Sequence, residues 1–176
     1  MVSMEEKIKA CVFQALESAT GTKGEGVYLV SVRVKGAGKQ TKIEILLDSD
    51  TGIRIDQCSF FSRRIRELLE NEGGTPVLDG EDFDLMVSSP GLGESLLMSR
   101  QYLRHIGRLL RVIYKDELQS EKIVTGRLQQ VLKTEGEITA VRLVPVKTGK
   151  KGAGNVQEPI ELTLDCIVRA VPEAEL

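Results

Sequence analysis

Residues 83–107 read FDLMVSSPGLGESLLMSRQYLRHIG, and at this stretch one sequence pattern gives way to another. Phe83, Leu85 and Val87 alternate with other residue types, which is the period-two pattern of a strand with one buried face. The Ser-Ser-Pro-Gly at residues 88–91 then predicts a turn, because proline fixes φ and glycine, here the last of the four, tolerates positive φ. The stretch therefore indicates the end of one folding unit and the start of another.

The composition is that of a globular protein. The chain has 176 residues, of which 41% are hydrophobic and 28% are charged, enough for one large or two small domains. No apolar run reaches the ~18 residues needed to span a bilayer, and the N-terminus lacks a secretion signal. The three cysteines, Cys11, Cys58 and Cys166, are widely spaced and are expected to be free thiols in a reducing cytoplasm.

Charge is unevenly distributed along the chain. Residues 1–90 contain 11 Lys and Arg against 15 Asp and Glu, whereas residues 91–176 contain 13 against 11. This mild asymmetry permits a basic contact face on the second half, where an anionic partner would bind.

Residues 1–90 predict the order helix, strand, strand, helix, strand. Ser3 opens a Ser-x-x-Glu capping box, followed by apolar residues at helical spacing. Strands at 27–35 and 41–48 flank a glycine-containing turn and form an antiparallel hairpin. Asp56 is expected to cap the second helix. With the strand described above, this order predicts an α+β domain whose two helices cover one face of a small mixed sheet.

Residues 91–176 predict one short helix and then only strands. The helix is expected to open at Ser99 and to end before Gly107. The strands are expected at residues 108–115, 122–133, 138–146, 160–164 and 168–171. Gly126 suggests a bend or bulge within the second of them. Five short, bent strands after one helix favour a small β-barrel, and the acidic tail after Pro172 is expected to be mobile.

The residues needed for catalysis are scarce. His105 is the only histidine, and near the end of a short helix it is expected to cap carbonyl groups or to face solvent. No Cys or His pair has metal-ligand spacing. Residues 36–41, GAGKQT, match a phosphate-binding loop only in part and lie between two strands, which favours a hairpin turn. The sequence therefore predicts a protein that is not an enzyme, with no catalytic residue, cofactor or metal.

Basic residues are the remaining candidates for a functional surface. They are Arg100, Arg104, Arg108 and Arg111, with Lys147, Lys150 and Lys151 in a later loop. Arg100 and Arg104 are one α-helical turn apart and are expected to share a face. These side chains could bind RNA phosphates, or they could form an ordinary solvated surface. With no Trp, three Tyr and four Phe, base stacking on aromatic platforms is disfavoured.

The segment Val87-Ser88-Ser89-Pro90-Gly91-Leu92 resembles the signature of the bacterial RimP family of ribosome maturation factors. Residues 52–63 and 101–107 are similar to further family segments, and residues 160–171 look like its closing strand, turn and short strand. Gly-Glu-Ser at 93–95 departs from the family's usual Asp-Arg-Pro, so an arginine is missing and an acid is gained. The likeness covers nearly the whole chain.

The resemblance implies an N-terminal α/β domain, residues 1–90, and a C-terminal Sm-like, SH3-type barrel domain, residues 91–176. It also implies binding to the small (30S) ribosomal subunit during its biogenesis, with rRNA and a ribosomal protein near the decoding region as partners. The interdomain connector is expected at Ser88, Ser89, Pro90 and Gly91. We expect a monomer with no membrane contact. A stand-alone RNA-binding module and a small-molecule-sensing regulatory domain remain as alternatives.

Overall fold

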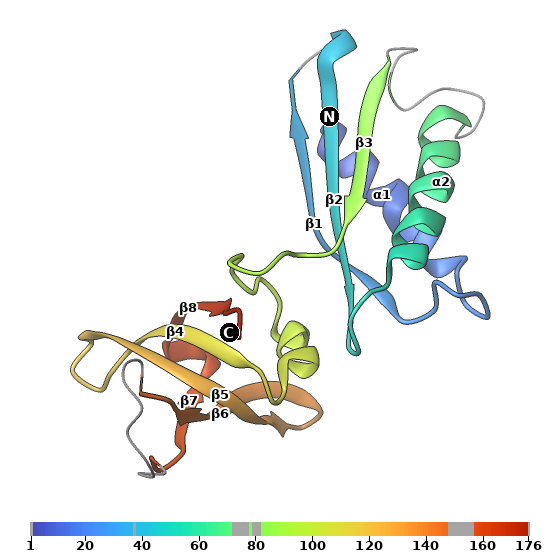
Figure 1. Ribbon diagram of the computed structural model, residues 1–176. Helices are drawn as coiled ribbons and strands as arrows, with labels where there is room; N and C mark the ends of the chain where they lie inside the picture. The colour runs from blue at the N-terminus through green and yellow to red at the C-terminus, as the bar shows by residue number, and fades with distance from the viewer. Residues whose placement is uncertain (1, 37, 72–77, 79–81, 148–156, 176) are drawn as a thin grey trace. The chain divides into compact units, whose positions relative to one another are not determined.

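The computed structural model describes residues 2–36, 38–71, 78, 82–147 and 157–175 (Figure 1). The chain divides into two compact units, Met1–Pro90 and Gly91–Leu176. We call them unit 1 and unit 2 and describe each by itself. Among the helices of the described residues, none is long and apolar enough to cross a membrane.

Unit 1 has the predicted order α-β-β-α-β. Its elements are α1 (Met4–Glu17), β1 (Val27–Lys35), the short 3₁₀ helix η1 (Gly38–Gln40), β2 (Thr41–Ser49), α2 (Ile55–Asn71) and β3 (Phe83–Ser88). The sheet order is β1-β2-β3, with β1 antiparallel to β2 and β2 parallel to β3. Because parallel neighbours need a crossover, α2 provides the connection from β2 to β3. The predicted mixed sheet is therefore confirmed.

Both helices of unit 1 pack on one face of this sheet. Ile43, Ile45 and Leu47 alternate along β2 and are buried. They share one apolar cluster with side chains of both helices, namely Ile8, Cys11, Val12 and Ala15 of α1 and Phe61, Ile65 and Leu69 of α2. Since alternate strand residues point to one side, the two helices must cover that same side. None of the three cysteines forms a disulfide; Cys11 is buried and the other two are half-buried.

The starts of the two helices differ in how well they were predicted. The capping box before α1 is confirmed: Glu6 N donates to Ser3 Oγ (3.2 Å), and Ser3 N donates to the Glu6 carboxylate (2.8 Å). The prediction that Asp56 caps α2 is wrong, because α2 begins one residue earlier and places Asp56 in its first turn.

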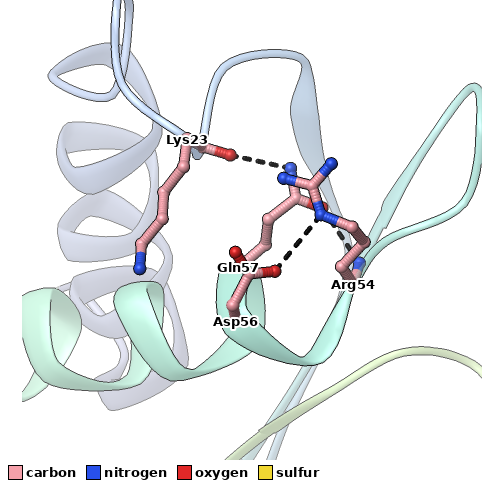
Figure 2. Close-up of polar contacts among 4 residues, drawn as sticks. All are labelled: Lys23, Arg54, Asp56 and Gln57. Atoms are coloured by element: carbon pink, nitrogen blue, oxygen red, sulfur yellow. Dashed lines mark hydrogen bonds and ion pairs between the residues drawn. The ribbon is translucent and has the colours of Figure 1, made fainter.

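The start of α2 is instead fixed by Gln57, whose side chain is buried (Figure 2). Its Oε1 accepts a hydrogen bond from Arg54 N (2.9 Å), and its Nε2 donates to Lys23 O (2.8 Å). Asp56 accepts from Arg54 Nε (3.2 Å) at the surface. A side-chain amide can satisfy a donor and an acceptor at once, which a carboxylate cannot.

In its described residues unit 2 contains the predicted short helix, five strands and a 3₁₀ turn. They are η3 (Ser99–His105), β4 (Leu109–Lys115), β5 (Glu121–Thr134), β6 (Glu137–Pro145), β7 (Ile160–Thr163), the 3₁₀ turn η4 (Leu164–Cys166) and β8 (Ile167–Pro172). The sheet order is β7-β6-β5-β4-β8, and all neighbours are antiparallel. Within the described residues β7 and β8 form no ladder with each other, so closure into a barrel is not seen.

Gly126 lies in β5 without a bulge, contrary to expectation. It pairs in register with both neighbouring strands, and the nearest register shift in β5 lies between Leu128 and Gln130. A Cβ atom added at Gly126 would stand 3.0 Å from the carbonyl oxygen of Val144. The close approach of the next strand therefore favours glycine at this position.

The helix η3 is a 3₁₀ helix that begins at Ser99, where the sequence placed its start. Ser99 does not cap it; instead the buried side chain of Gln101 accepts hydrogen bonds from Leu97 N (2.7 Å) and Met98 N (2.8 Å). Its predicted end is confirmed, because Gly107 has a φ of +88°.

The residues after the connector cover one edge of the second sheet. Leu96 N donates to Ala170 O (2.8 Å), and Gly93 N donates to Pro172 O (3.2 Å). Both carbonyl groups belong to β8, so its outer edge is occupied. Positive φ occurs at Gly93 (+82°), whereas Gly91, which could also have adopted it, does not.

Candidate nucleic-acid interface

The predicted basic residues do not all lie together. Arg100 and Arg104 are half-buried on η3. Residues four apart in a 3₁₀ helix, which has three residues per turn, are rotated by about 120°, so the expected shared face does not form. Lys150 and Lys151 lie outside the described residues.

Two exposed arginines do lie side by side on unit 2. Leu109 of β4 is opposite Arg127 of β5, and Arg111 is two residues farther along β4. The two arginine side chains thus occupy diagonal positions on the same sheet face. We call Arg111 and Arg127 the arginine face. Arg108 is also exposed, just before β4.

Arg127 was not identified from the sequence. The alternation of exposed and buried residues along β5 could have placed it on the outer face, but only the strand pairing brings it next to Arg111. Its guanidinium also donates to Gly107 O (2.5 Å), which holds it beside the end of η3.

The acidic tail lies against the arginine face instead of extending away. Arg111 Nε is 3.3 Å from the Glu173 carboxylate, and Arg127 Nη1 is 2.7 Å from that of Glu175. Glu173 N donates to Leu109 O (3.1 Å), which continues the strand pairing. The structure thus gives Glu173 and Glu175 defined partners, whereas the sequence predicted a mobile tail. Exposed ion pairs of this kind contribute only about 0–1 kcal/mol each, so another anion can replace the carboxylates.

The only histidine is buried rather than exposed. His105 is 4% exposed and lines a hollow of about 420 Å³ with Arg108, Glu173 and Glu175. Burial, reinforced by the charges of Arg104 and Arg108, lowers the pKa of His105 to about 4. Neither ring nitrogen has a hydrogen-bond partner among the described residues.

A general base must reach the proton that it removes, usually through a hydrogen bond to the nucleophile. His105 makes no such bond in the described part of the chain. Within the same residues no group of three His, Cys, Asp or Glu side chains could hold a metal ion. The described residues therefore form a two-unit α+β protein in which exposed arginines and carboxylates lie together on the surface of unit 2.

Comparison with known proteins identifies the family. Residues 19–93 match the RimP N-terminal domain. The chain is 94% identical over 176 residues to the ribosome maturation factor RimP of Chlorobium limicola, covering 100% of both chains. It is 53% identical over 173 residues to that of Chlorobium phaeobacteroides (98% of this chain, 100% of the relative). With the RimP of Cytophaga hutchinsonii it shares 32% identity over 161 residues (92% and 89%).

The chain therefore belongs to the RimP family of ribosome maturation factors. This confirms the resemblance found in residues 87–92 and agrees with the expectation of a protein that is not an enzyme.

Proposed function

We propose that this protein binds the small (30S) ribosomal subunit during its biogenesis and acts there without catalysing a reaction. The observation that carries the proposal is the 94% identity, over the whole of both chains, to a protein named as a ribosome maturation factor. With identity this high over the whole of both chains, a shared binding partner is expected.

The arginine face, with Arg108 beside it, is our candidate for contact with rRNA or with an rRNA-bound protein. Guanidinium groups bind phosphate through paired hydrogen bonds, and Arg111 and Arg127 would exchange their tail carboxylates for phosphate oxygens. Arg100, Arg104, Lys150 and Lys151 stay as weaker candidates. The family resemblance adds a ribosomal protein near the decoding region as a second contact.

In this proposal the two units are functional domains of a cytoplasmic monomer, and unit 2 acts as an Sm-like barrel. The connector at Ser88, Ser89, Pro90 and Gly91 then sets the path between the domains. Pro90 is buried, which supports an architectural role for this segment.

Sucrose-gradient sedimentation tests the proposal. The wild-type chain should travel with free small subunits and not with complete ribosomes. The double substitution Arg108→Glu and Arg111→Glu should weaken co-sedimentation, most strongly at low salt, because phosphate contacts release counterions. Arg33→Glu, an exposed residue of β1, is the matched control and should bind as wild type does. A wild-type chain absent from the small-subunit fractions would refute the proposal.

A stand-alone RNA-binding role is the second candidate, because the arginine face could accept phosphates of any RNA. The two roles differ in affinity for short RNA. Oligonucleotides bound as tightly as whole subunits would favour the stand-alone role, whereas weak binding would favour subunit recognition.

A further inference from the structure

A groove of about 810 Å³ runs along one side of unit 1, between α2 and β3. Its α2 wall is formed by Ile55, Cys58, Ser59, Ser62 and Arg63, which share one stripe of the helix. Its other wall is formed by residues 85–88 of β3 and by Ser89, which follows the strand. Since successive strand residues point to opposite faces, four in a row can line one groove only along the edge of the strand.

The edge that lines this groove is unpaired in the described residues. β3 is the last strand of its sheet and has a ladder only with β2. Such an edge presents free N–H and C=O groups, which proteins usually cover or guard with charge. The outer edge of β8 is covered by Gly93 and Leu96, and β1 carries exposed Arg33 and Lys35. β3 carries the exposed Asp84 near its start, but the exposed residue of β3 that lines the groove is Met86 (54% exposed).

The groove combines apolar contact surface with positive charge. Ile55, at its α2 end, is 87% exposed. Of the residues that the structure describes, two charged ones line it, Arg54 and Arg63. Arg54 is 3.2 Å from the Asp56 carboxylate, whereas Arg63 is exposed and forms no ion pair with any residue that the structure describes. An occupant with an apolar residue and a carboxylate would therefore complement the groove.

We propose that this groove binds an extended segment of a partner protein, which adds a fourth strand to the free edge of β3. One side chain of the segment packs against Ile55 and Met86, and an acidic side chain pairs with Arg63. A segment that spans residues 85–89 needs about five residues at ~3.3 Å each. Its main chain supplies the alternating donors and acceptors of a sheet ladder, which an RNA backbone lacks. The inference rests on the proposed function, because the partner is sought in the small subunit.

The test compares two neighbouring charge reversals in the full chain, with purified free small subunits as the probe. Arg63→Glu should weaken binding about tenfold, since it places a repelling charge in the groove. Arg64→Glu makes the same change one residue away, at an exposed side chain that does not line the groove. It should bind within about twofold of wild type. Thermal melting checks that both variants fold.

A photo-crosslinking residue at Ser62, in the groove, identifies the occupant. Cross-links to an extended, acid-containing segment of a small-subunit protein would support the proposal. Cross-links to rRNA or to a second copy of this chain would overturn it.

The failure of this inference can be told from the failure of the proposed function. If wild type binds small subunits and the two reversals bind equally, the groove is not the docking site but the function stands. If wild type does not bind them at all, both are overturned.

Discussion

The stability of unit 2 should depend on pH through a single buried group. His105 is neutral in the folded chain at pH 7, because its pKa is lowered to about 4 by burial and by the charges of Arg104 and Arg108. The carboxylates of Glu173 and Glu175 line the same hollow, but each is engaged by an arginine. As the pH falls, this histidine takes up a proton at a higher pH in the unfolded chain than in the folded chain.

The direction and size of the effect follow from linkage. In the unfolded chain the histidine pKa returns to its ordinary value of 6.5. As pH falls below 6.5 the unfolded state takes up a proton that the folded state does not, so stability is lost down to the folded pKa. The expected loss is about 2 kcal/mol between pH 7 and pH 5, and about 3 kcal/mol once pH reaches 4.

The assay uses the fact that the chain has one histidine. Its ring proton gives one NMR resonance, whose titration reports the folded pKa directly. Amide exchange of β4 in the full chain reports the stability of unit 2 at each pH. His105→Leu removes the titrating group at similar volume, and its stability should change much less between pH 7 and pH 5. A measured pKa above 6, or equal pH slopes for variant and wild type, would refute the reasoning.

Three further predictions concern other parts of the chain. Gln57→Ala should lower the free energy of unfolding by about 1–2 kcal/mol in urea denaturation, because it removes two part-buried hydrogen bonds, to Arg54 N and Lys23 O. Gly126→Ala should cost about 1–3 kcal/mol through contact with the next strand. Its control is Gly91→Ala, whose added Cβ meets no atom within 4 Å and which should change the free energy of unfolding by less than about 0.5 kcal/mol. Glu173→Gln with Glu175→Gln should leave stability nearly unchanged. It should tighten subunit binding and steepen its salt dependence by about 0.7–0.9 for each arginine that gains a phosphate, as measured by sedimentation in a salt series.

Features that depend on a few neighbouring residues were predicted well. The capping box at Ser3 needs only two side chains three positions apart. The glycine at 107 is required by positive φ at a helix end. Strands such as β2 follow from alternation within one segment. In each case the interaction that decides the structure lies inside the pattern that predicts it.

Features decided by distant residues were missed for the same physical reason. Gln57 displaces Asp56 as the residue that fixes α2 because its partner, Lys23, is 34 positions away. Arg127 reaches Glu175 across 48 positions. His105 looked exposed because a short helix near a glycine usually is, and only the packing of unit 2 buries it. Contacts between residues this far apart cannot be read from a hydrophobic pattern within one helix or strand.

Residues 83–107, which include the boundary between the units, contribute to two sheet edges. In the described residues the edge of β3 is unpaired, whereas the edge of β8 is covered. Val87 and Ser88 line the groove along the open edge of β3, whereas Leu96, a few residues later, donates to Ala170 and closes the edge of β8. An open edge is tolerated only where indiscriminate pairing is prevented. The α2 stripe can do this, because a segment that pairs with β3 must also fit its side chains between the strand and the helix. The same geometry that leaves this edge free therefore makes it selective.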